Sequence, residues 1–242
     1  MALAGLGAGA INAVVGSGTL ITFPVLLAVG YPPVLANVSN NVGLVSGGVS
    51  TVLANRPELI GQRPRLTKLA GASAAGGITG ALALLVLPAD AFRAVVPVLI
   101  GIACVLVVLQ PRLSERLSQR RGTRSEIEPL LVLAVFGTGV YGGFFGAAQG
   151  VLLIAVMGVL LDESLQRVNA AKNVLSLVVN AVAALVFVLV TDVAWEAAGL
   201  VALGSIVGGQ LGARLGRRVP APVLRGLVVL VGVAAIVALL LT

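Results

Sequence analysis

The stretch Gly76-Gly77-Ile78-Thr79-Gly80-Ala81 returns 132 residues later as Gly208-Gly209-Gln210-Leu211-Gly212-Ala213. The same offset joins four further pairs: Asn37 with Asn169, Asn41 with Asn173, Pro88 with Pro220, and Arg93 with Arg225. Nearer the start, Gly9 and Gly16 match Gly139 and Gly146 at an offset of 130, so a two-residue length change separates these regions. The chain is therefore two copies of one half.

The composition is that of a membrane protein. Hydrophobic residues make up 58% of the chain and charged residues 10%, against about 25% charged in an average soluble domain. Apolar runs such as 130–161, 174–190 and 226–241 approach or exceed the roughly 20 helical residues that cross a bilayer. The spacing of Gly and Ala suits packed helices rather than an outer-membrane barrel. We expect an all-α membrane protein.

Basic residues indicate which loops face the cytoplasm. Thirteen of the sixteen Lys and Arg fall in three polar segments: Arg56, Arg63, Arg65 and Lys68; Arg112, Arg116, Arg120, Arg121 and Arg124; and Arg214, Arg217, Arg218 and Arg225. Such segments are typical of cytoplasmic loops, whereas a contiguous nucleic-acid-binding arm would have another pattern. We therefore expect the loops 56–68, 111–129 and 214–225 inside, both termini outside, and no nucleic acid as partner.

The run 130–161 conflicts with this topology if it crosses the membrane once. It is 32 residues long, and its middle, 137–150, is rich in glycine, which disfavours a continuous helix. A re-entrant helical hairpin or two short spans would both resolve the conflict, and the sequence leaves these two open. The first half repeats the feature in 3–30, broken at Gly16-Ser17-Gly18-Thr19.

Each half then has an odd number of effective crossings, which predicts two inverted-topology repeats. Each repeat has a Gly-broken or re-entrant first segment followed by about three transmembrane helices. We expect a first repeat at 1–110, a basic cytoplasmic linker at 111–129 and a second repeat at 130–242. A parallel repeat of four simple spans per half is the alternative.

Broken membrane helices place backbone N–H groups where they bind something polar, and helix N-termini favour anions. Asparagines four residues apart share a helix face, and Lys172 supplies a cation. The predicted anion site comprises Gly16, Ser17, Gly18, Thr19, Asn37, Ser39, Asn40, Asn41, Gly146, Gln149, Gly150, Asn169, Lys172 and Asn173. Two alternatives stay open: the glycines only let helices approach closely, and Lys172 only reaches the cytoplasmic headgroups.

The residues that are absent narrow the function. The chain has no His, and its apolar spans contain no Asp or Glu, so an intramembrane proton relay is poorly supported. The catalytic sets of hydrolases, metal-ligand clusters and a Walker-type loop are missing too. The single cysteine, Cys104, is expected to be a buried small hydrophobe. We predict a permease rather than an enzyme or pump, with no cofactor and no metal.

Two stretches carry a resemblance to a known family: Gly9-Ala10-Ile11-Asn12-Ala13-Val14-Val15-Gly16-Ser17-Gly18-Thr19-Leu20-Ile21-Thr22-Phe23-Pro24, and Gly30-Tyr31-Pro32-Pro33-Val34-Leu35-Ala36-Asn37-Val38-Ser39-Asn40-Asn41-Val42. They resemble the sulfite exporter TauE/SafE family of bacterial inner-membrane permeases. The resemblance implies a multi-pass permease for sulfite, a sulfonate or a related small oxyanion. In that family the position of Asn41 is commonly basic, which here leaves Lys172 as the cation.

The predicted function is therefore secondary transport of a small oxyanion across the bacterial inner membrane, through a site between the repeats. The partners expected are the anion and the lipid bilayer, with a homodimer as a further candidate. An anion channel and a non-transporting membrane assembly protein are the alternatives. The sequence leaves the exact anion, the direction of transport and the coupling ion open.

Overall fold

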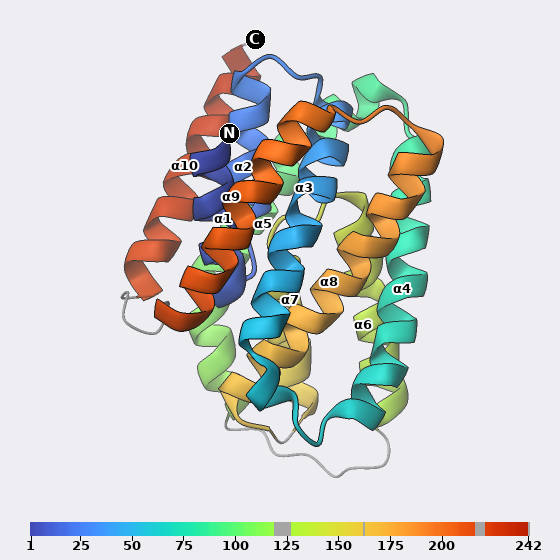
Figure 1. Cartoon of the computed structure of the whole chain (residues 1–242), viewed down its shortest axis with the longest axis vertical. Helices are drawn as coiled ribbons and strands as arrows, with labels where there is room; N and C mark the ends of the chain where they lie inside the picture. Colours follow the sequence, from blue (N-terminus) through green and yellow to red (C-terminus); the bar gives the residue numbers. More distant parts are fainter. Residues whose placement is uncertain (119–126, 162, 216–220, 242) are drawn as a thin grey trace.

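A computed structural model of the chain describes residues 1–118, 127–161, 163–215 and 221–241. Within these ranges the chain is helical, with ten α-helices, one short 3-10 helix and no strand (Figure 1). The first half holds α1 (Ala2–Val14), α2 (Thr19–Ala28), α3 (Pro33–Ala54), η1 (Arg56–Leu59), α4 (Arg63–Val86) and α5 (Ala89–Ser118). The second holds α6 (Ile127–Phe144), α7 (Gln149–Leu160), α8 (Leu165–Val190), α9 (Trp195–Leu215) and α10 (Ala221–Leu241).

Among the described residues, four helices are long and apolar enough to cross a membrane: α4, α5, α8 and α9. α1, α2 and α7 are shorter, with 13, 10 and 12 residues. At 1.5 Å per residue these three are about 15–20 Å long, less than the ~30 Å hydrocarbon core. The predicted all-α membrane class is confirmed.

The two predicted helix breaks are present. α1 ends at Val14 and α2 begins at Thr19, while α6 ends at Phe144 and α7 begins at Gln149. The second break lies within the glycine-rich run 137–150, as predicted, and α6 remains helical through Gly143. A Cβ at Gly143 would collide with the carbonyl oxygen of Gly77 in α4, so tight packing outweighs weak helix propensity here.

The duplicated glycine stretches pack each half against the other. α4 lies along α6, and α9 lies along α1. In both pairs, a Cβ on each glycine would collide with a carbonyl oxygen of the facing helix: Gly76 with Phe136, Gly80 with Val140, Gly208 with Leu6, and Gly212 with Ala10. These contacts correspond under the offsets of 130 and 132. The repeated sequence therefore encodes a repeated contact between the halves.

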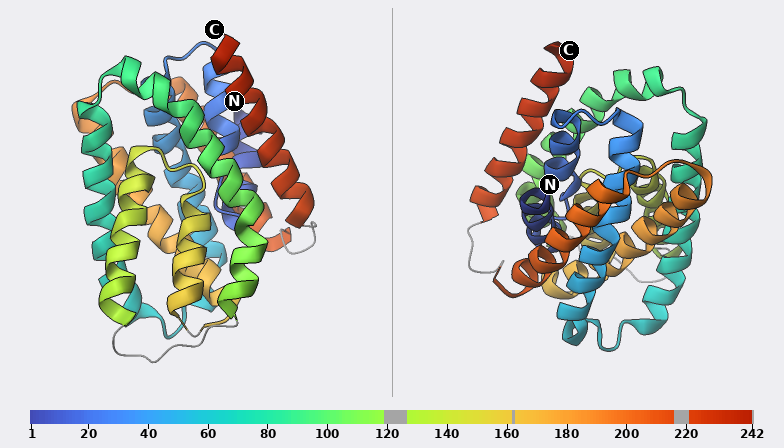
Figure 2. Two further views of the ribbon diagram at one scale, coloured as in Figure 1. Left: turned by 180° about the vertical axis from the view of Figure 1, so that it is seen from behind. Right: turned by 45° about the horizontal axis from the view of Figure 1, so that its top comes forward.

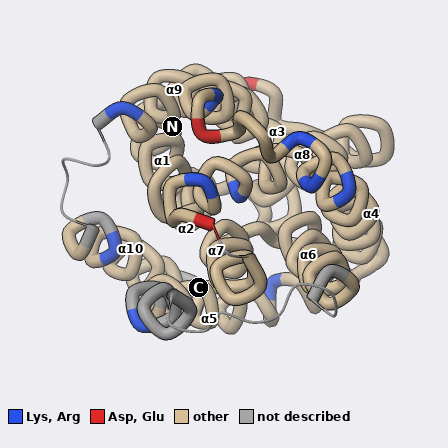
Figure 3. Tube along the Cα trace, turned by 90° about the horizontal axis from the view of Figure 1, so that it is seen from below, with Lys and Arg blue, Asp and Glu red and all other residues tan. Residues whose placement is uncertain are grey.

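The broken segments fold as hairpins within the bundle. α6 and α7 pack against each other, and the start of α6 and the end of α7 lie at the same end of the molecule (Figure 2, left). The α3–α4 and α7–α8 connections and the end of α5 share this end (Figure 1), which we name the basic end. The α2–α3, α4–α5 and α8–α9 connections and the C-terminus lie at the opposite end. Seen from the basic end, α2 and α7 lie near the middle of the helices (Figure 3).

Ion pairs at the basic end join the two halves. Glu163, just before α8, contacts Arg65 of α4 at 2.6 Å and Arg167 of α8 at 2.7 Å. Arg167 also donates to the carbonyl of Ile60 at 3.0 Å. Partial burial raises the pKa of Glu163. The hydrogen bonds and positive charges of Arg65 and Arg167 together lower this pKa by more, so it lies below its ordinary value. Five arginines used in the topology prediction lie outside the described residues: Arg120, Arg121, Arg124, Arg217 and Arg218.

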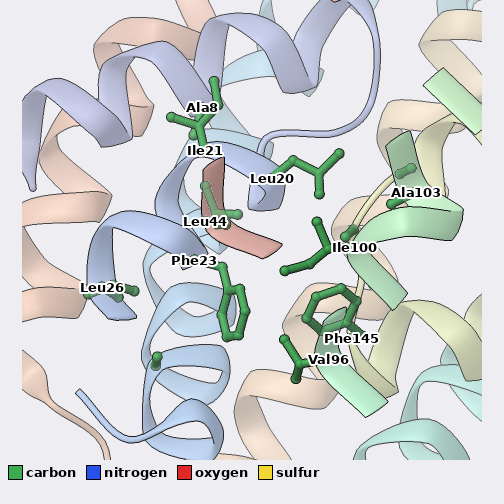
Figure 4. Packing of buried hydrophobic residues seen from close by; sticks show 14 of the residues in the cluster. Ala8, Leu20, Ile21, Phe23, Leu26, Leu44, Val96, Ile100, Ala103 and Phe145 are labelled. Carbon is green, nitrogen blue, oxygen red and sulfur yellow. The ribbon is translucent and has the colours of Figure 1, made fainter. Parts of the chain in front are cut away.

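The larger hydrophobic core cluster lies around α2 and α5. Phe23, Ile100 and Phe145 belong to it (Figure 4). Cys104 of α5 is buried, as predicted, and a Cβ at Gly232 of α10 would lie 2.5 Å from its Sγ. This core packs residues of α2, α5 and the start of α7 together.

Candidate functional site

The two helix breaks have the same backbone conformation. Gly16 has φ +85° and Gly146 has φ +77°, a left-handed conformation that glycine adopts without steric penalty. Each of these glycines donates its N–H to the carbonyl five residues earlier, at Ile11 and Tyr141 respectively. The sequence correspondence between Gly16 and Gly146 is thus a structural correspondence.

The two breaks meet at a pair of glycines. The backbone N–H of Gly150 donates to the carbonyl of Gly16 at 3.1 Å. A Cβ added to Gly16 would lie 2.5 Å from the Cα of Gly150. The approach is this close because neither residue carries a side chain, so Gly16 and Gly150 bring backbone from both halves into one place.

Each broken helix is capped by a side chain from the other half. Asn169 of α8 donates to the carbonyl of Ala13 at 3.2 Å, at the end of α1. Its counterpart Asn37 of α3 donates to the carbonyl of Phe144 at 3.0 Å, at the end of α6. The last carbonyls of a helix have no partner within it and carry the negative end of its dipole. These two asparagines satisfy them across the interface between the halves.

Lys172 lies over the contact between the breaks. Its side chain is 1% exposed, its ammonium donates to the carbonyl of Asn12 at 2.9 Å, and its Cδ would be 3.3 Å from a Cβ at Gly16. The interpretation that Lys172 reaches the headgroups is therefore wrong. The ion pairs described for Glu163, with Arg65 and Arg167, do not include Lys172.

Several buried donors beside the breaks lack an acceptor. The Oγ of Ser17, the Nε2 of Gln149 and the Nδ2 of Asn173 are buried without a hydrogen-bond partner. Of the backbone hydrogen bonds described outside helices, none is donated by Ser17, Gly18, Thr19, Ala147 or Ala148. Buried polar groups are normally paired. The unpaired donors of Ser17 and Gln149 belong to the two breaks, and Asn173 follows the buried Lys172 in α8; the Oδ1 of Asn169, an acceptor, is unpaired too.

Three predicted site residues form side-chain hydrogen bonds within the protein. Ser39 accepts a hydrogen bond from the backbone N–H of Ala194, at 2.9 Å, just before α9. Asn40 donates to the Oγ1 of Thr19 at 3.3 Å and accepts from the hydroxyl of Thr22. Asn41 donates to Asn180 at 3.4 Å. In the structure, these contacts fix α9, the start of α2, and α3 against α8, respectively.

A cavity of about 350 Å³ opens beside this site, between the ends of α1, α3 and α9 and the start of α8. Asn169 lies on its wall, next to the carbonyl of Ala13 that this asparagine caps. The remaining lining is Val14, Ala54, Asn55, Pro57, Glu58, Leu165, Gln166, Gly212 and Ala213. It belongs to the basic end, because α3 ends and α8 begins there. The cavity thus leads from the basic end toward the first break.

The sequence as a whole matches one known family. The sequence model of the sulfite exporter TauE/SafE family covers residues 1–239. The chain belongs to the sulfite exporter TauE/SafE family. The TauE/SafE proteins are membrane transporters, so the predicted family and its membrane location are confirmed.

Relatives that the chain resembles have general names. "Probable membrane transporter protein YfcA" of Escherichia coli K12 is 29% identical over 209 residues, which cover 86% of this chain and 76% of the relative. "Probable membrane transporter protein ORF9" of a Sinorhizobium species is 29% identical over 234 residues, covering 96% and 88%. A "probable membrane transporter protein" of Haemophilus influenzae is 28% identical over 206 residues, covering 85% and 79%. No solved structure matches the chain.

The TauE/SafE site also involves residues that the sequence did not single out. Asn12 provides the carbonyl that binds Lys172. Tyr141 donates its hydroxyl to the carbonyl of Ala147 at 2.6 Å and so fixes the second break. Asn12 and Gly142 correspond at the offset of 130, so the duplication held no signal for the role of Asn12. Tyr141, in contrast, stands out as the one tyrosine within the glycine-rich stretch 137–150.

Proposed function

We propose that this protein is a secondary permease that moves a small oxyanion, sulfite or an organosulfonate, across the bacterial inner membrane. The observation that carries the proposal is the set of unpaired buried donors around Lys172, where backbone from both halves meets. A sulfite or sulfonate group presents three oxygen acceptors and negative charge. Such a group would satisfy the hydroxyl of Ser17, the amides of Gln149 and Asn173, and the ammonium of Lys172.

The chemistry at the breaks supports an anion rather than a cation. An ammonium has three donors, of which one is used on Asn12, so Lys172 retains donors for a ligand. The backbone N–H groups of Ser17, Gly18 and Thr19 lie at the N-terminus of α2, which carries the positive end of a helix dipole. Charge-assisted hydrogen bonds of this kind are stronger than neutral ones.

The orientation in the membrane that we propose is an inverted repeat with the basic end in the cytoplasm. Three features support it: the hairpin of α6 and α7 starts and ends at the basic end, the C-terminus lies at the opposite end, and Arg63 and Arg65 begin α4 at the basic end. The two halves also contact each other through corresponding glycines, as repeats related by a pseudo-two-fold axis do.

Single cysteines at Ser118 and Thr191, in a Cys104→Ala background, test this orientation. Ser118 ends α5 at the basic end, and Thr191 follows α8 at the opposite end. A membrane-impermeant maleimide applied to intact cells is expected to label the cysteine at 191 and not the one at 118, which becomes reactive only after the membrane is permeabilised. Labelling of 118 alone, or equal labelling of both in intact cells, would exclude the inverted arrangement.

Transport itself is tested in proteoliposomes that contain the purified protein. We expect saturable uptake of radiolabelled sulfite, acceleration by unlabelled sulfite or a short sulfonate on the far side, and no uptake in empty liposomes. A carrier shows both saturation and counterflow, because its site is exposed to one side at a time. Flux without counterflow would identify an anion channel, and absence of flux for all sulfur oxyanions would favour a non-transporting assembly protein.

A further inference from the structure

The basic-end cavity has a counterpart in the second half that is filled. Under the two offsets, cavity-lining Val14, Ala54, Asn55, Gln166 and Ala213 correspond to Phe144, Val186, Phe187, Val34 and Ala81. All five counterparts belong to the larger hydrophobic core cluster or pack against it. At these five of the eleven lining positions, the fold is therefore open at the basic end and packed at the opposite end, whereas Leu189 and Val190, the counterparts of Pro57 and Glu58, are exposed.

Aromatic side chains provide the filling. Phe145 contacts Phe23 of α2, with ring centroids 5.3 Å apart, and Phe92 of α5, at 6.3 Å. Phe144 contacts Phe92 at 5.9 Å, and Phe187 of α8 is 1% exposed. We name these five residues the aromatic cluster; Figure 4 shows Phe23 and Phe145 facing each other within it. Edge-to-face pairs of this kind add to the stabilisation from burial.

The aromatic cluster lies between the second break and the opposite end. Phe144 and Phe145 directly precede Gly146 of the break, and Asn37, which caps α6, stands at the start of α3 near that end. In the first half, the counterparts of Phe144, Phe145 and Phe187 are Val14, Val15 and Asn55, respectively. The two valines are smaller than phenylalanine, and the asparagine is polar. The difference in packing between the two ends thus follows from sequence differences between the two halves.

We propose that the aromatic cluster is the gate that closes the anion site from the non-cytoplasmic side, and that the basic-end cavity is the passage open to the cytoplasm. The proposal rests on the permease function proposed above. Because the two halves share one backbone fold, each half can adopt the conformation that the other half has in this structure. Such a change would separate the rings of Phe144, Phe145 and Phe187. It would also close the cavity wall at Val14 and Asn55. The described state is then the one open to the cytoplasm.

Reaction rates of matched cysteines test the gate without any substrate. Gln166→Cys reports on the basic-end cavity, and Val34→Cys reports on its counterpart, each in a Cys104→Ala background. The probe is a charged, membrane-impermeant methanethiosulfonate, applied to inside-out vesicles for 166 and to right-side-out vesicles for 34. We expect rapid reaction at 166 and slow reaction at 34.

Replacing cluster residues by their counterparts should open the opposite end. Phe187→Asn and, separately, Phe144→Val are each expected to raise the reaction rate at 34 by about tenfold or more, because loss of a buried ring weakens the closed state. Phe136→Val, a change in α6 outside the aromatic cluster, is the control and should leave that rate unchanged. In the reverse direction, Asn55→Phe should slow the reaction at 166 by about tenfold, since it adds a ring to the cavity wall.

The outcomes separate the gate from the permease. Unchanged rates at 34 in both Phe187→Asn and Phe144→Val, with folded protein by gel filtration, would overturn the gate, as would fast reaction at 34 before any substitution. If either Phe187→Asn or Phe144→Val fails to fold, the remaining variant and Asn55→Phe test the gate. Failure of the permease proposal would instead appear as absent flux in proteoliposomes, with the labelling rates unaffected.

Discussion

Replacing Lys172 with Ala will weaken the binding of sulfite or a sulfonate by about ten- to a hundredfold, since a charge-assisted hydrogen bond contributes about 1.5–3 kcal/mol. The ammonium lies where the breaks meet, and the ion pairs described elsewhere in the chain do not include it. Isothermal titration of the purified protein with sulfite measures the change. Thermal unfolding of the same sample shows whether the variant is folded.

Two further substitutions separate the charge of Lys172 from its packing. Lys172→Met keeps an unbranched stem over Gly16 and Gly150 but has no charge, so it should lose as much affinity as Lys172→Ala while it retains more stability. Lys172→Arg should recover only part of the affinity, because a planar guanidinium replaces a compact ammonium. Wild-type dissociation constants in the Ala and Met variants would rule out Lys172 as the cationic partner of the anion.

Gly16→Ala is expected to destabilise the fold by about 2–5 kcal/mol, the combined effect of left-handed backbone and overpacking. The φ of +85° at Gly16 disfavours any L side chain. In addition, the new Cβ would lie 2.5 Å from the Cα of Gly150, which presses the two breaks apart and removes the anion site. A lower unfolding temperature in detergent, together with lost sulfite binding, is the expected result.

Gly137→Ala is the matched control for Gly16→Ala. Gly137 lies in the glycine-rich part of α6, and a Cβ there would have no atom within 4 Å. An alanine in a helix interior at such a position should leave stability unchanged or raise it by about 0.5–1 kcal/mol. Equal effects of the two substitutions would show that the contact between Gly16 and Gly150 has no special role.

Sequence alone predicted the features that depend on local chemistry or on the duplication. The glycines at 16 and 146 mark helix breaks because both adopt positive φ, and the offset between them predicted that the breaks are equivalent. The glycines have both of the roles that the sequence suggested, helix breaks and close packing of helices. Gly16 and Gly146 form the breaks, whereas Gly139 and Gly143 lie inside α6 and pack against α4.

The sequence could not predict the role of side chains whose hydrogen-bond partners lie far away in the chain. Ser39 binds the backbone of Ala194, 155 residues away, and no local pattern distinguishes such a serine from one that faces a ligand. For Lys172 the sequence left two interpretations open, an anion-binding residue and a residue that reaches the headgroups. Burial decides between them, and burial depends on how α1, α7 and α8 pack. The contrast between Asn55 and Phe187 was visible in the duplication, but its meaning required the cavity.

The exchange of caps between the halves has a consequence for biosynthesis. The carbonyl of Ala13 is bound by Asn169, which follows it by 156 residues. At a synthesis rate of about 5–20 residues per second, the ribosome needs roughly 8–30 s to make the intervening chain. In that interval the end of α1 lacks the cap that Asn169 provides, so the carbonyl of Ala13 needs water or another donor until α8 has been made.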